Sequence, residues 1–215
     1  MSKGWEKFFF VFTWICQGSS YLSAKAYGIL HRMHHAYADT EHDPHSPSYD
    51  DNLFAMMWRT REVYNSIFYK EAVMDERFTK DIPEWDSFDK FASNNFVRVL
   101  WIGAYAAFYI AFATQWWMYL LIPIHALMGP AHGVVINWFA HKYGYTNFET
   151  KDTAKNLLPF DFLMMGESYH NNHHRYGSRP NFGGIRWHEF DPTYPVILLL
   201  DKIGIIQLAH VQAHQ

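Results

Sequence analysis

The longest uncharged stretch of the chain predicts a helical hairpin that crosses a membrane. Residues 99–141 contain no Asp, Glu, Lys or Arg, and one membrane-spanning helix needs only about 20 apolar residues. The expected arms are residues 96–113 and 117–140, joined by a turn at Thr114 and Gln115. A buried helix pair in a soluble protein is the alternative, because the mean hydropathy is only −0.23.

The residues that flank this hairpin predict its orientation. Trp116, Trp117 and Tyr119 at the turn are the residue types that gather at a membrane interface. Arg98 precedes the first arm and Lys142 follows the second. Because positively charged flanks favour the cytoplasmic side, we expect both ends of the hairpin to face the cytoplasm.

Hydrophobic patterning organises the rest of the chain as well. Residues 5–30 carry apolar positions without a small-residue cleavage site, which predicts a buried or interfacial helix leading into His31 and not a signal peptide. Residues 36–51 are polar and rich in proline, which predicts a loop. Apolar positions at helical spacing predict an amphipathic helix over 53–68, and charged residues 70–90 predict a connection in water.

Composition narrows the class of protein. A net charge of −3 gives no electrostatic basis for binding nucleic acid. The single cysteine, Cys16, cannot form an internal disulfide. Aromatic residues make up 19% of the chain, which fits the interfaces of a membrane protein.

The candidate chemistry lies in a histidine motif that the sequence contains twice. The spacing HxxHH appears at residues 31–35 and again at 170–174, in a chain with 14 histidines. On a helix, positions three and four apart share one face, so each motif aims three imidazoles at one point. A lone histidine is usually a surface or core residue, but two matched clusters predict a transition-metal site. Imidazole ligands suit zinc, copper, iron and nickel.

Further polar residues lie near these motifs in the sequence. Asn137 and His141 are four apart at the end of the hairpin, and we expect His141 to be a seventh metal ligand. Asp43 is expected to orient a metal-binding imidazole from behind. The remaining histidines of these segments are expected to support the site or the packing without binding metal: His42, His45, His125 and His132.

Taken together, these motifs resemble the membrane fatty acid desaturases of the acyl-CoA (stearoyl-CoA) delta-9 type. The matching segments are the motif at 31–35, the stretch 40–45 (TEHDPH), the pair Asn137 and His141, the stretch 166–174 (GESYHNNHH), and 186–188 (RWH). Their order and spacing agree with the family over nearly the whole chain.

The resemblance implies an all-α fold, a polytopic membrane helix bundle with a cytosolic, histidine-rich cap that holds two metal ions. The implied cofactors are two iron ions. The implied iron ligands are His31, His34, His35, His141, His170, His173 and His174, and Asn137 acts through a water. The family places basic contacts to the head group of the acyl carrier at positions that correspond to Arg32, Arg59 and Arg61.

The implied activity is O2-dependent desaturation of a fatty acyl chain carried as a thioester, in the synthesis of unsaturated fatty acids. No GxGxxG motif follows a predicted strand, so electrons are expected from an external donor of the cytochrome b5 or ferredoxin type. The catalytic face of this integral membrane protein is expected to be cytoplasmic. Two alternatives stay open, a related di-iron hydroxylase and an inactive, truncated metal-binding fragment.

The sequence departs from the family in one respect. The family's first histidine box, HxxxxH, is expected upstream of residue 5 and does not occur in this chain, so seven of nine histidine ligands are present. We therefore expect Met1 to be an internal methionine of a longer protein. The predicted organisation is one N-terminally truncated desaturase domain, 1–215, with a helix leading into the first motif (1–35), the hairpin (96–140) and a cytosolic cap (141–215).

Overall fold

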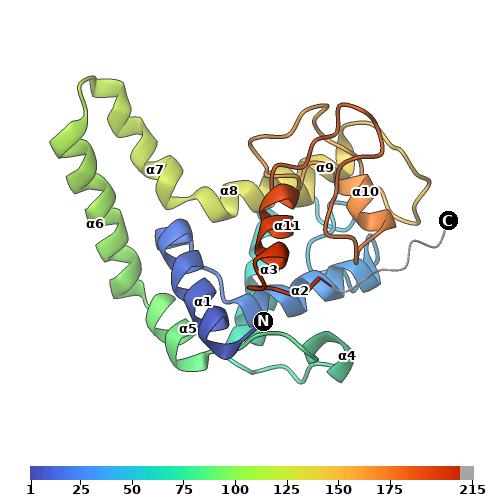
Figure 1. Ribbon diagram of the computed structural model, residues 1–215, viewed down its shortest axis with the longest axis horizontal. Coiled ribbons are helices and arrows are strands. Elements are labelled where there is room, and N and C mark those ends of the chain that lie inside the picture. The colour runs from blue at the N-terminus through green and yellow to red at the C-terminus, as the bar shows by residue number, and fades with distance from the viewer. Residues whose placement is uncertain (209–215) are drawn as a thin grey trace. The chain divides into compact units, whose positions relative to one another are not determined.

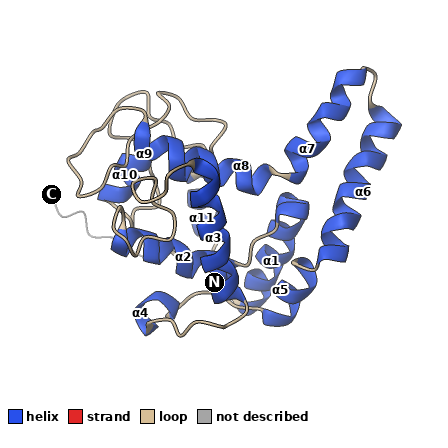
Figure 2. Ribbon diagram, turned by 180° about the vertical axis from the view of Figure 1, so that it is seen from behind, coloured by secondary structure: helices blue, strands red, loops and turns tan. Residues whose placement is uncertain are grey.

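The computed structural model describes residues 1–208 and confirms the all-α prediction, because it contains helices and no named strand in that range (Figures 1 and 2). The helical elements are α1 (Lys3–Gln17), η1 (Gly18–Ser20), α2 (Ala24–Tyr37), α3 (Leu53–Phe68), α4 (Glu76–Thr79), α5 (Asp86–Ala92), α6 (Asn95–Phe112), η2 (Trp116–Leu120), α7 (Leu121–Ala126), α8 (Met128–Val134), η3 (Val135–Phe139), α9 (Ala140–Lys142), α10 (His170–Arg175) and α11 (Tyr194–Lys202). The final residues of the predicted cap, 209–215, lie outside the described range.

The described chain divides into two compact units. The histidine unit contains residues 1–5, 33–59 and the chain from 134 onward, and the hairpin unit contains residues 6–32 and 60–133. Four helices, α1, α2, α3 and α8, begin in one unit and end in the other.

In the hairpin unit, α6 confirms the first predicted arm to within one residue at each end. Its first turn is capped by Asn94, whose side-chain oxygen accepts a hydrogen bond from the Phe96 N–H at 2.8 Å. Only 6% of α6 is buried, and the helix is long and apolar enough to cross a membrane. Figure 1 shows α6 followed by a turn into α7, which runs back along it.

The second predicted arm, 117–140, is helical but is not one straight helix. The helices of 116–126 and 128–142 are bent by 70° where they meet, so the described chain has one candidate span, or two if the bent pair counts as a span. Pro130 explains the break, because it lacks the N–H that the Ala126 carbonyl would accept in a straight helix. That carbonyl instead accepts hydrogen bonds from the hydroxyls of Ser19 and Ser20, at 3.3 and 3.1 Å.

The N-terminal apolar segment also differs from the prediction, because two helices replace one. The chain turns at Gly18, whose φ of +53° is a left-handed conformation that glycine adopts most easily. A Cβ at this position would collide with the Tyr105 hydroxyl, whose oxygen accepts the Ser19 N–H at 3.2 Å. Beyond the turn, Asp89 accepts hydrogen bonds from Tyr21 and Ser23, at 2.7 and 2.8 Å, and fixes the start of α2.

The remaining predicted elements agree with the structure in most places. The amphipathic helix predicted over 53–68 is α3, with the same limits. The region 38–52 is a loop, as its prolines predict. The charged connection 70–90 contains α4 and the start of α5, which sequence patterning did not predict. The aromatic belt and the cytoplasmic orientation of the hairpin ends stay predictions.

The interior of the histidine unit is polar. Side chains less than 5% exposed there include His34, Asp43, His141, His170 and Asn171. Burying such groups is costly unless they are hydrogen-bonded or bind a metal. Much of this unit is loop, as Figure 2 shows around α9 and α10, so the polar interior must be organised by side-chain interactions.

Candidate metal centre

Four histidines from three separate segments converge in the histidine unit. His34 comes from α2, His141 from α9, and His170 and His174 from α10. One ring nitrogen of each lies within 4.8 Å of the others. The Nε2 atoms of His34 and His174 are 3.2 Å apart, and those of His141 and His170 are 3.1 Å apart. The predicted convergence of the two motifs and His141 is therefore present for these four residues.

An oxygen atom faces the Nδ1 atom of three of these rings. Asp43 lies 2.9 Å from His34 Nδ1, and Asp152 lies 2.9 Å from His174 Nδ1. The Nδ1 atom of His141 lies 3.2 Å from the Thr153 hydroxyl and 3.6 Å from a carboxylate oxygen of Asp39. Metal-binding histidines usually donate their second N–H to such an oxygen, which fixes the tautomer and the orientation of the ring.

These partners allow a test of whether a metal fits the site. A carboxylate can only accept, so we assign the proton to Nδ1 of His34 and of His174, which leaves a lone pair on each Nε2. The two lone pairs then face each other across 3.2 Å, and a shared cation relieves their repulsion. Metal–nitrogen bonds of about 2.0–2.1 Å place neighbouring ligand nitrogens roughly 3 Å apart, as observed here. The donor set therefore fits a transition metal.

Burial lowers the pKa of two imidazoles in this cluster, those of His170 and His174. Burial, followed by the neighbouring histidines, lowers the pKa of His170 well below its usual value. Burial also lowers the pKa of His174, against the opposing effect of Asp152. Although burial alone would raise the pKa of Asp152, its hydrogen bond with His174 lowers that pKa to about 2. Neutral imidazoles beside ionised carboxylates are the state in which histidines bind metal.

A second pair of histidines lies next to this cluster. The Nε2 atoms of His35 and His173 are 2.8 Å apart, and the two rings meet edge to face. His31 lies one helical turn before His35 on α2 but belongs to the hairpin unit, where its ring stacks on Tyr27 with 5.8 Å between ring centroids. The pair at His35 and His173 is a candidate for a second metal position.

Polar side chains of the second motif hold α10 in place. Asn171, fully buried, accepts the backbone N–H groups of Asn147 and Phe148 and donates to the carbonyls of Phe148 and Ala154. Both asparagines of the motif therefore stabilise the fold around α10, while its histidines take part in the histidine clusters. A helix of six residues is too short to be stable by itself, so these contacts position His170, His173 and His174.

A buried glutamate completes this support. Glu189 accepts hydrogen bonds from the Tyr145 hydroxyl at 2.8 Å and from the side-chain amides of Asn147 and Asn172, at 2.6 and 3.1 Å. The oxygen of the Asn172 amide also accepts from Asn147 and from Asn156, at 2.8 and 3.1 Å. This network links the loop before α10 to the loop after it.

The other predicted site residues have different surroundings. Among residues 1–208, Asn137 has no hydrogen bond to a histidine, and it lies in the π-helical turn η3. Arg32 donates to the carbonyls of Phe78 and Lys80, at 3.3 and 2.6 Å. Arg59 donates to Asp50 at 2.6 Å and Arg61 is exposed. The roles of Asn137 and of the three arginines stay predictions.

Two positioning carboxylates were missed by the sequence reasoning. A carboxylate oxygen of Asp39 accepts hydrogen bonds from the backbone N–H and the hydroxyl of Thr153, at 2.6 and 2.7 Å, and a carboxylate oxygen of Asp152 lies 2.9 Å from His174 Nδ1. Asp39 follows the first motif by four residues, which is a usable signal, but nothing in the sequence connects Asp152 to the second motif. His45 is buried against His34, with 4.2 Å between ring centroids, in agreement with a supporting role.

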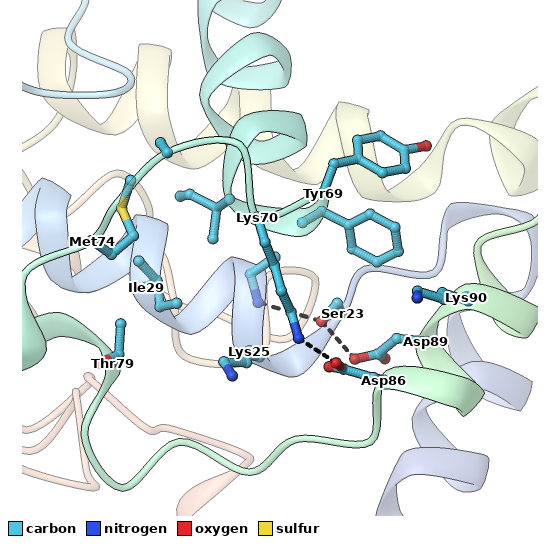
Figure 3. A pocket seen from close by; sticks show the side chains of 14 residues that line it. Ser23, Lys25, Ile29, Tyr69, Lys70, Met74, Thr79, Asp86, Asp89 and Lys90 are labelled. Carbon is cyan, nitrogen blue, oxygen red and sulfur yellow. Dashed lines mark hydrogen bonds and ion pairs between the residues drawn. The ribbon is translucent and has the colours of Figure 1, made fainter.

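The hairpin unit contains a cavity of about 420 Å³ whose lining includes none of the predicted ligands (Figure 3). Apolar side chains of α2 and α3, among them Ile29 and Ile67, form part of its wall. Lys70 crosses the cavity to an ion pair with Asp86, as the dashed line in Figure 3 shows. The wall also contains Lys25, Asp89 and Lys90, so it carries charges of both signs.

Comparison with known proteins agrees with this site. Residues 2–200 match the family described as fatty acid desaturase. The chain is 32% identical over 209 residues to the sn-1 stearoyl-lipid 9-desaturase of Synechocystis sp., covering 94% of this chain and 59% of that protein. It is 29% identical to the delta-9 desaturase-like 5 protein of Arabidopsis thaliana (82% and 56%) and 28% identical to the acyl-CoA 5-desaturase AL21 of Anemone leveillei (81% and 52%).

These relatives are longer than the chain, which spans between about half and three fifths of their length. No solved structure matches the chain. The family match nevertheless extends over both HxxHH motifs, over His141 and over the carboxylates that hold their rings. The chain therefore belongs to the fatty acid desaturase family.

Proposed function

We propose that this chain carries the histidine-bound metal centre of an enzyme that desaturates a fatty acyl chain with O2. The observation that supports the proposal most strongly is the convergence of His34, His141, His170 and His174 from three segments, with oxygen partners behind three of the rings. Three oxygen partners from different segments, each facing the Nδ1 atom of one ring, favour a metal site over a hydrogen-bonded core.

The proposed cofactor is a pair of iron ions, which would supply the O2 chemistry that no amino-acid side chain can provide. The proposed ligands are the four converging histidines together with His31, His35 and His173, with Asn137 acting through a water. Asp43 and Asp152 would keep the Nδ1 protons of His34 and His174 in place. Fixed tautomers hold the Nε2 lone pairs toward the metal and avoid reorganisation during the reaction.

The proposed substrate is a fatty acyl chain, bound to CoA by our sequence-based expectation. Relatives named as stearoyl-lipid desaturases favour a second carrier, an intact membrane lipid. We further propose an external electron donor of the cytochrome b5 or ferredoxin type, and a catalytic face on the cytoplasmic side of the membrane.

Product analysis tests this proposal. The chain is produced in a host that makes only saturated fatty acids, and total fatty acids are analysed by gas chromatography and mass spectrometry. We expect a monounsaturated product that disappears with His34→Ala. His42→Ala is the matched control, because His42 is an exposed histidine of the loop after α2 and should leave the product unchanged.

The other outcomes separate the alternatives. A hydroxylated fatty acid in place of an alkene would establish the hydroxylase alternative. Absence of any product, with a folded chain and a supplied electron donor, would contradict the proposal and favour a metal-binding protein without this activity. The purified protein is then supplied with the electron donor and with either an acyl-CoA or an acyl phospholipid. The substrate that yields the product identifies the acyl carrier.

A further inference from the structure

Six large apolar side chains form an exposed surface on the histidine unit, here called the aromatic patch. Its members are Phe160, Phe162, Leu163, Met165, Trp187 and Phe190, and all are more than half exposed, with Leu163 at 84% and Trp187 at 92%. They come from two loops, 159–165 and 185–190. These loops lie side by side, because His188 Nδ1 donates to the Pro159 carbonyl at 2.7 Å and the Phe162 and Phe190 rings are 6.3 Å apart.

A buried carboxylate holds the first loop in its conformation. Asp161, only 1% exposed, lies between the two exposed phenylalanines of this loop. Its carboxylate accepts the backbone N–H groups of Met164, Gly166 and Ser168, at 2.7 to 3.0 Å. With Asp161 directed inward, Phe160 and Phe162 are directed outward.

The second loop is built in the same way. Glu189 is buried and accepts the N–H groups of Ile185 and Arg186, at 3.2 and 3.0 Å, so its neighbour Phe190 is left at the surface. Asp191 then accepts the N–H of Thr193, whose hydroxyl donates to the Met165 carbonyl of the first loop. Because the loops are already ordered, binding through the aromatic patch costs little conformational entropy.

The charge of the aromatic patch restricts what can cover it. Asp161 and Glu189 are the only carboxylates in residues 157–165 and 184–190, and both are buried. Arg186 is the only charged residue exposed in these segments, and its guanidinium lies over the Tyr145 ring. The surface is therefore apolar with a positive edge, which suits a lipid bilayer with anionic head groups.

We propose that the aromatic patch inserts into the interfacial layer of a lipid bilayer. Trp, Phe and Leu side chains are the residues that enter this layer. The same chain carries α6, a candidate membrane span, and a span of this kind would tether the patch to a bilayer and raise its effective concentration there. Insertion would fix how the histidine unit faces the membrane, independently of the reaction at the metal centre.

Site-directed labelling tests this proposal. Cys16 is the one cysteine of the chain and is exposed, so Cys16→Ser provides a background for single labels. A spin label is attached at Leu163→Cys, and at Ser178→Cys as a matched control, because Ser178 is an exposed loop residue of the same unit outside the aromatic patch. The full chain is reconstituted into vesicles of phosphatidylcholine and phosphatidylglycerol.

The measurement is the collision rate of each label with oxygen, which concentrates in lipid, relative to a water-soluble nickel chelate. We expect oxygen to dominate at position 163 and the nickel chelate at position 178. Equal exposure to the chelate at both positions would overturn the proposal. Shielding at position 163 that depends on protein concentration and not on lipid would assign the surface to a second copy and would also overturn it.

A second labelled position shows whether the result at position 163 reflects only a local folding defect. Trp187→Cys reports on the other loop of the aromatic patch, and circular dichroism compares each variant with its parent. If both labels avoid lipid in chains with unchanged circular dichroism, the proposal fails. Oxygen-dominated collisions at both positions support it.

Discussion

The two histidine motifs share one spacing but are held in place in two different ways. The first motif lies on α2, a helix of 14 residues whose own backbone hydrogen bonds set the positions of His31, His34 and His35. The second lies on α10, a helix of only six residues. In the first motif Asp43 holds the ring of His34, whereas the second motif depends on side chains from distant loops.

This difference appears in the spacer residues of the motifs. The spacers of the first motif are Arg32 and Met33, and those of the second are Asn171 and Asn172, both buried. Arg32 donates hydrogen bonds to the carbonyls of Phe78 and Lys80, away from the motif, whereas both spacers of the short helix hold the loops around that helix. Identical spacing therefore predicts identical chemistry without predicting how the structure supports it.

The largest expected effect comes from Asn172→Ala. This change removes a hydrogen-bond partner from Asn156 and Glu189, which are buried, and from Asn147, which is half-buried. Each such group costs about 1–3 kcal/mol, so we expect the free energy of unfolding to fall by about 3 kcal/mol or more. Thermal or chemical unfolding of the purified chain measures it.

The matched change in the first motif is Met33→Ala, at the equivalent spacer position. Met33 lies on a regular helix, and alanine favours helix formation, so we expect a loss of about 1 kcal/mol or less. Equal destabilisation by both substitutions would contradict the distinction between the two motifs.

A smaller effect, on metal affinity, is expected when the carboxylates that face the Nδ1 atoms of His34 and His174 are replaced. Asp43→Asn affects the first motif and Asp152→Asn the second, because each removes the ionised acceptor of one Nδ1 proton. Such partners typically contribute about 10- to 100-fold to metal affinity. Competition with a chelator measures the affinity, and Asp50→Asn, which affects only the pair with Arg59, serves as the control.

The two losses of metal affinity show whether the two motifs also differ in how they hold metal. Similar losses for Asp43→Asn and Asp152→Asn would show that the two motifs differ in folding support but not in how they hold metal. No loss for either variant would argue against the assigned tautomers of His34 and His174.

The smallest effect concerns Glu167, three residues before α10. Burial, followed by Asp191 and Asp161, raises the pKa of Glu167 from 4.5 to about 7. The folded chain therefore retains this proton, and the stability it contributes below pH 4.5 is lost as the pH rises through about 7. We expect Glu167→Gln to stabilise the chain at pH 8 by about 1–2 kcal/mol, after a discount for partial exposure, and not at pH 4.

Unfolding at the two pH values measures this difference. Glu149→Gln is the control, because Glu149 is exposed on a loop of the same unit. A pH-independent effect of Glu167→Gln would show that the carboxyl group does not titrate differently in the folded chain.

Sequence patterning predicted the parts of the fold that depend on local periodicity. Apolar spacing predicted the limits of α3, and the uncharged stretch predicted those of α6 to within one residue at each end. The convergence of His34, His141, His170 and His174 was predicted from repeated spacing and family resemblance. The helix limits and the spacing within each HxxHH motif are encoded by residues close together in the chain.

The features that were missed depend on contacts between distant residues. The break before Pro130 is stabilised by Ser19 and Ser20, more than 100 residues earlier. Thr153 meets Asp39 across a similar separation. Such residues become partners only when the chain folds, so the periodicity of a single sequence gives no signal for these contacts.

The most direct test of the central claim is the metal content of the detergent-purified chain, measured by elemental analysis after growth in iron-rich medium. We expect bound iron that is lost with His34→Ala and equally with His170→Ala, because each motif contributes one of these residues to the same cluster. His42→Ala should retain it. Iron that survives either cluster substitution, or a folded parent chain that binds no transition metal, would contradict the account.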